Sequence, residues 1–89
     1  MAKMTKKQME TLVDFGYRSL MAEKFDGYAN KAIKAEDWDE FHSCMKACYR
    51  NADIAVKAAR ELGMTDKQID DVCASLLVWS KFHNERVAA

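Results

Sequence analysis

The fold is decided by the stretch from Asp37 to Gly63, which reads DWDEFHSCMKACYRNADIAVKAARELG. Its apolar residues recur at steps of three and four, a spacing that keeps them on one side of a helix. These residues are Trp38, Phe41, Met45, Cys48, Ala52, Ala55, Ala59 and Leu62. Asp37 suits the N-cap position, and Gly63 suits the left-handed residue that often ends a helix. The pattern therefore predicts one long helix over residues 37–62, with large apolar side chains first and alanines later.

The residues that follow predict a second long helix, over about 65–86. Capping-box pairs stand at two places in the chain, Thr5 with Gln8 and Thr65 with Gln68. Only two residues separate the two long segments, so we expect them to fold back on each other as an antiparallel hairpin. Counting outward from the turn places Ala52 beside Leu76 in this hairpin.

The residues before the long segment predict a helix over about 5–24 and a short segment over 28–34, both packed on the hairpin. One broad face of the first helix carries Met9, Leu12, Val13, Gly16, Tyr17, Leu20 and Met21. We expect this face to enter the core, and Gly16 to mark a place where another backbone passes close by. Asp26 and Gly27 form a turn signal, which favours a break at Gly27 over one bent helix.

Composition places the chain among small all-α bundles. Its 89 residues suit one domain, 1–89, and 49% of them are hydrophobic against 31% charged. Fourteen basic and fourteen acidic residues cancel, so general attraction to nucleic acid or to an anionic membrane is not expected. Apolar runs are too short to span a bilayer, and the odd number of cysteines fits a reducing compartment. We therefore expect a cytoplasmic protein that does not contact membranes.

Basic residues follow the helical period beside the apolar stripe of the long segment. The set with its neighbouring aromatic is Lys46, Arg50, Lys57, Arg60 and Tyr49. A functional interpretation is a surface that docks an acidic partner or a phosphate. The alternative is a solvated face with local ion pairs, such as Asp53 with Lys57.

Two cysteines and a histidine form a second candidate site. Cys44 and Cys48 are four residues apart on one side of a helix, and the hairpin register brings His83 near Cys44. Two thiolates and an imidazole could hold zinc or iron. The alternative is that the cysteines are small core residues, and on that interpretation no cofactor is expected.

Residues 55–72 resemble a helix-turn-helix core. Ala59 occupies a position that needs a small residue, Gly63 stands at the turn, and Ile69 lies where the second helix packs inward. The resemblance implies a DNA-binding regulator. The second helix of the motif opens with acidic residues that oppose contact with phosphates, namely Asp66, Asp70 and Asp71.

No catalytic arrangement of nucleophile, base and orienting group is visible, and no glycine-rich phosphate loop occurs, so we do not expect an enzyme. The leading hypothesis is a small adaptor or inhibitor that covers a surface of a partner macromolecule. Accessory proteins of phages and mobile elements often have this size. Aromatic residues outside the predicted core, including Tyr17 and Tyr28, favour a homodimer.

Overall fold

A computed structural model describes residues 3–88, so Met1, Ala2 and Ala89 of the predicted domain lie outside the described residues. The described chain contains four helices and no strand. These helices are α1 (Lys6–Lys34), α2 (Trp38–Glu61), α3 (Asp66–Val72) and α4 (Leu76–Ala88). The predicted all-α class and the small helical bundle are confirmed.

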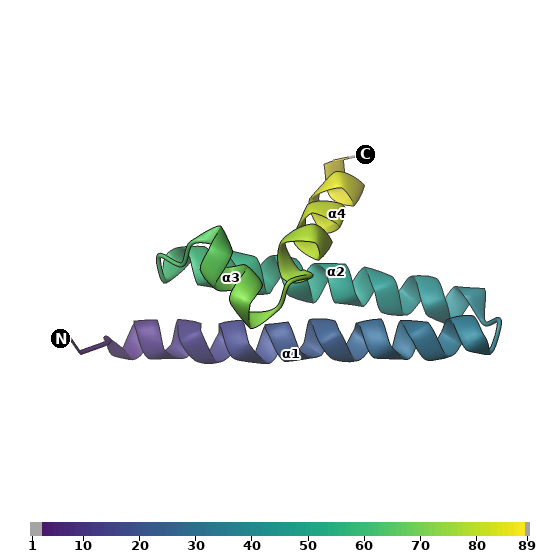
Figure 1. The fold of residues 1–89 in the computed structure, drawn as a ribbon, viewed down its shortest axis with the longest axis horizontal. Coiled ribbons are helices and arrows are strands. Elements are labelled where there is room, and N and C mark those ends of the chain that lie inside the picture. Colours follow the sequence, from purple (N-terminus) through teal and green to yellow (C-terminus); the bar gives the residue numbers. More distant parts are fainter. Residues whose placement is uncertain (1–2, 89) are drawn as a thin grey trace.

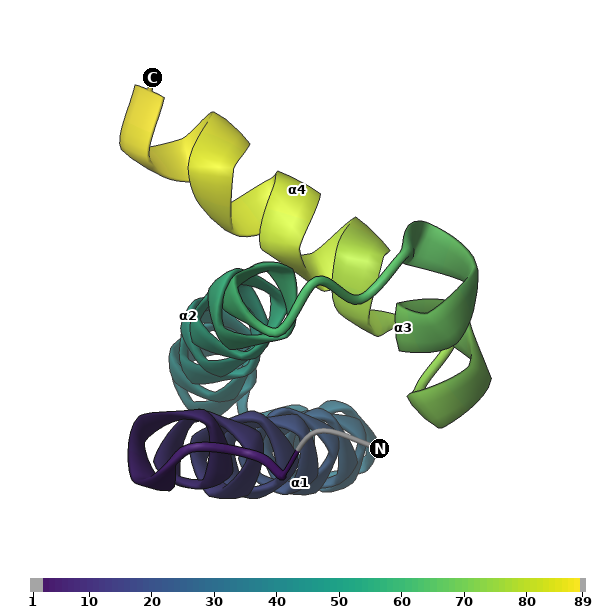
Figure 2. The same ribbon diagram turned by 90° about the vertical axis from the view of Figure 1, so that its left-hand side faces the viewer.

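The longest antiparallel pair consists of α1 and α2, which lie side by side over their whole length (Figure 1). The molecule is consequently elongated, with extents of 51 × 25 × 21 Å. The predicted pairing of residues 37–62 with a single helix over 65–86 is wrong, because α3 and α4 are separate and α4 crosses α2 near its middle (Figures 1 and 2).

The ends of the helices form as their sequences predict. Both predicted capping boxes are present, with the backbone and side-chain bonds of Thr5–Gln8 and Thr65–Gln68 between 2.8 and 3.2 Å. The Asp37 side chain accepts a bond from the amide of Glu40 at 3.1 Å. After α2, Gly63 adopts a φ of 76°, and the amide of Met64 donates to the Ala59 carbonyl at 3.0 Å. This arrangement is a Schellman motif, and it reverses the chain after α2.

The predicted break at Gly27 is wrong, because α1 continues through this glycine to Lys34. Ala29 and Ala32 follow it, and both are buried against α2. Extending the packed helix by two turns outweighs the cost of about 1 kcal/mol that glycine adds to a helix interior. The chain turns only at Glu36, whose φ of 56° lies in the left-handed region.

The predicted helix over 65–86 is interrupted at Cys73, whose backbone is extended with φ −155° and ψ 113°. Val72, the last residue of α3, is 53% exposed. The interruption redirects α4 so that its side chains reach the buried carboxylate of Asp53, which Ser80 and Asn84 bind. Buried carboxylates require such donors.

The core lies on the opposite side of α1 from the side predicted. The buried residues of α1 are Phe15, Ser19, Ala22, Ala29 and Ala32. The predicted face is largely exposed, and Val13 reaches 71% exposure. Alanines on both helices permit a close approach that bulkier side chains would prevent. None of the described helices is long and apolar enough to cross a membrane.

Candidate partner-binding site

The four predicted basic residues divide into two pairs with different surroundings. Lys57 lies with its Nζ 2.8 Å from Oδ2 of Asp53, and Arg60 forms an ion pair with Asp66. Lys46 and Arg50 are exposed and form no ion pair with any residue between 3 and 88. Only the charges of Lys46 and Arg50 are therefore left without a paired carboxylate in the described chain and available to an external ligand.

Lys57 belongs to a structural network around Asp53, which is 4% exposed. The Ser80 hydroxyl and the Asn84 amide donate to Oδ1 of Asp53 at 2.9 and 3.0 Å. Burial alone would raise the pKa of this carboxyl, but the bonds from Lys57, Ser80 and Asn84 together hold the pKa below its ordinary value. The network attaches α4 to α2.

Lys46 and Arg50 line two adjoining surface hollows. The first has a volume of about 410 Å³, and its other lining residues are Arg18, Phe25, Ser43, Ala47 and Asn51. The second has a volume of about 260 Å³, and its other lining residues are His83, Arg86 and Val87. Neither lining includes an acidic residue. The two hollows together form what we call the basic face.

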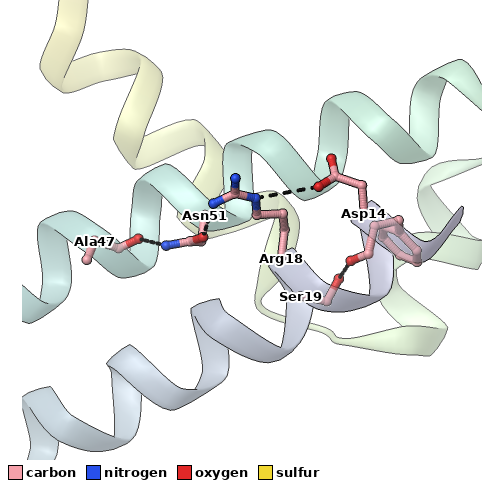
Figure 3. A network of polar contacts seen from close by, with 6 residues as sticks. Asp14, Arg18, Ser19, Ala47 and Asn51 are labelled. Carbon is pink, nitrogen blue, oxygen red and sulfur yellow. Dashed lines mark hydrogen bonds and ion pairs between the residues drawn. The ribbon is translucent and has the colours of Figure 1, made fainter. Parts of the chain in front are cut away.

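Arg18 joins the basic face from α1 (Figure 3). Its Nη1 donates to Oδ1 of Asn51 at 3.0 Å, and the Asn51 amide donates to the Ala47 carbonyl at 2.8 Å. Its Nε forms an ion pair with Asp14, with 3.6 Å between Nε and Oδ1. These contacts hold the guanidinium beside the hollow. The sequence offered no signal for Arg18, because only the packing of α1 on α2 brings it near Arg50.

Tyr49 lies at the edge of the core and lines neither hollow. Its ring meets Phe82 at a centroid distance of 5.5 Å, and burial raises the pKa of its phenol. Edge-to-face aromatic pairs of this kind stabilise the packing of two helices. Tyr49 thus helps to position α4, which carries His83 and Arg86 to the basic face.

A hollow near the other end of the α1–α2 pair has mixed charge. Its volume is about 330 Å³, and its charged lining residues are Lys7, Glu10, Asp14, Lys57 and Glu61. Lysines and carboxylates alternate there, so their fields largely cancel. The single sign of charge at the basic face is therefore not a general property of the grooves along α2.

The residues of the candidate metal site have different surroundings. Burial, followed by a hydrogen bond to Glu40, raises the pKa of the Cys44 thiol, and burial raises the pKa of Cys48 to about 12. His83 lies instead with Lys46 and Arg50. Between residues 3 and 88, no group of three or more His, Cys, Asp or Glu side chains is placed to hold a metal ion.

The segment that resembles a helix-turn-helix ends in a short acidic helix. The seven-residue α3 exposes Asp66, Asp70 and Asp71. Lys67 of the same helix pairs with Asp71 at 3.3 Å. The exposed charge of α3 opposes contact with phosphates, and the basic face lies elsewhere on α2.

Comparison with protein-family models, with curated proteins and with solved structures finds no match to this chain. The candidate site is accordingly defined by residues of this chain alone.

Proposed function

We propose that this protein is a non-enzymatic interaction module, an adaptor or inhibitor that covers a surface of a partner protein with its basic face. One observation carries the proposal. Lys46 and Arg50 have no intramolecular ion pair among the described residues, yet they lie between two hollows that Arg18 and Arg86 also line. Arg18 has a counter-charge in Asp14, whereas Lys46, Arg50 and Arg86 form no ion pair among the described residues. Unpaired cations that lie close together repel one another, and a bound anionic group would relieve that cost.

The chemistry of the basic face fits an acidic protein segment. Guanidinium groups bind carboxylates through paired, charge-assisted hydrogen bonds, and two arginines frame the lysine here. Phe25 and Val87 add apolar surface to the hollows, which would receive aliphatic side chains of the same segment. A nucleic acid would need broader attraction to its phosphates, whereas this chain has a formal net charge of zero.

We further propose that the module acts as a homodimer in the cytoplasm. All three cysteines are free, which agrees with a reducing compartment. Tyr17 and Tyr28 remain about half exposed, as the expectation of self-association requires. A dimer would present two basic faces and would bind a partner with two acidic segments more tightly than a monomer.

Affinity capture from a lysate of the source cells tests the basic face directly. The bait proteins are the wild type, a double variant Lys46→Glu/Arg50→Glu, and a control Lys34→Glu/Lys81→Glu with the same change in net charge. Both control lysines are exposed and line neither hollow. We expect the wild type and the control to capture the same dominant protein, and the double variant to capture at least about tenfold less.

The opposite result would be equal capture by all three baits, which would remove the basic face as the contact surface. A short DNA duplex, titrated at low salt and followed by fluorescence anisotropy, distinguishes the regulator hypothesis. DNA binding that falls steeply with salt and is lost in the double variant would mean that the partner is a nucleic acid and not a protein. Circular dichroism of each bait verifies that its helices are intact.

A further inference from the structure

The outer face of α1 is an apolar surface that is largely open to solvent. It consists of Met9, Leu12, Val13, Tyr17 and Leu20, which are between 45% and 71% exposed. Monomeric proteins expose single apolar residues routinely, but a continuous row over three helical turns is typical of an interface.

The molecule exposes more surface than its mass requires. Its accessible area is 6255 Å², whereas a compact monomer of 10.2 kDa exposes about 5,300 Å². The radius of gyration, 14.3 Å, likewise exceeds the value of about 12 Å for a globule of this length. The excess of roughly 1,000 Å² is comparable to the area of about 800 Å² that each partner buries in a stable interface.

Gly16 lies at the centre of the outer face. A Cβ built on it would meet no atom within 4 Å, so nothing within this chain requires a glycine there. Leu12 and Leu20 stand four residues before and after it, on the ridge that residues four apart form along a helix. A small residue between two large ones leaves a notch into which another helix can cross closely. The expected close approach at Gly16 is therefore not satisfied within one chain.

We infer that two copies of this chain pair through this face, with their α1 helices crossing at Gly16 about a two-fold axis. This inference rests on the homodimer proposed above and assigns its interface. The spacing of Leu12, Gly16 and Leu20 is the same read in either direction, so the two-fold axis sets Leu12 against Leu20 of the partner subunit. Ridges of this kind pack into each other at about −50°.

The test is sedimentation velocity of the wild type, Gly16→Leu and Gly27→Leu over a wide range of protein concentration. Both glycines are exposed in α1 with open space around the missing Cβ, so both variants are expected to fold. Gly27 lies about 16 Å along the helix from the crossing point, where the two α1 helices have diverged. We expect Gly16→Leu to weaken dimerisation at least about tenfold and Gly27→Leu to leave it unchanged.

Two results would overturn the inference, and they are distinguishable. A wild type that is monomeric at every concentration removes both the homodimer and its interface. A wild-type dimer that Gly16→Leu does not weaken leaves the homodimer standing but removes this interface. Cysteine cross-linking provides a second measurement in a Cys73→Ser background. Gly16→Cys should form an intermolecular disulfide on mild oxidation, and Gly27→Cys should not.

Discussion

The two faces of α1 differ in the size of their side chains more than in their polarity. The inner face buries Ala22, Ala29 and Ala32 against α2, while the outer face leaves Val13 and Leu20 in solvent. A count of apolar residues would have chosen the outer face for the core. The difference teaches that two long helices select the face that lets their axes approach, because close packing rewards matched shapes.

Enlarging a side chain on the inner face of α1 is expected to change the free energy of unfolding the most. Ala29→Leu inserts three carbons where Ala29 has no exposed surface, so we expect a loss of about 3 kcal/mol in the free energy of unfolding. The neighbouring Asn30 is exposed, so Asn30→Leu should change the free energy of unfolding by less than about 0.5 kcal/mol. Urea denaturation of both variants measures the difference. Equal losses would mean that the two faces do not differ in packing.

Charge offers the same contrast between a buried and an exposed position. Asp53 is enclosed by Lys57, Ser80 and Asn84, whereas Asp71 pairs with Lys67 in solvent. We expect Asp53→Ala to lower the free energy of unfolding by about 2 kcal/mol, because buried donors lose their acceptor. Asp71→Ala should cost less than about 0.5 kcal/mol. Denaturation at neutral pH compares the two.

The pH dependence of that difference follows from the lowered pKa of Asp53. A carboxyl whose folded-state pKa lies below its unfolded-state value stabilises the fold above the unfolded pKa, and the contribution is lost as the pH falls through the folded value. The advantage of the wild type over Asp53→Ala should therefore hold above about pH 4 and shrink below it. An advantage that grows on acidification would contradict the lowered pKa.

Features that depend on neighbouring residues could be predicted from the sequence. The extent of α2, both capping boxes and the turn at Gly63 each require only residues within a few positions. The path of α4 could not be predicted, because the carboxylate of Asp53 that attracts Ser80 lies 27 residues away along the chain. Secondary structure could thus be predicted where it depends on nearby residues, whereas the direction of α4 across α2 could not.

The candidate site was predictable to the same extent. Helical periodicity identified Lys46 and Arg50, but it could not separate them from Lys57, whose partner Asp53 is buried by α4. It also missed Arg18, since spacing along one helix carries no information about the residue that a second helix brings alongside. Charge patterns in a sequence therefore find basic residues, while the fold decides which of them remain unpaired.

Apart from the control variants, a substitution at Gly27 is expected to change the free energy of unfolding the least. It tests whether α1 is continuous or breaks at the turn signal of Asp26 and Gly27. Gly27 is helical and exposed, with no atom within 4 Å of an added Cβ. Gly27→Ala should therefore raise the free energy of unfolding by up to about 1 kcal/mol, since alanine loses less backbone entropy in a helix. Thermal denaturation in dilute solution measures this gain. A loss of stability would mean that the chain needs glycine to turn at this position, and the extended inner face beyond it, with Ala29 and Ala32 against α2, would then be wrong.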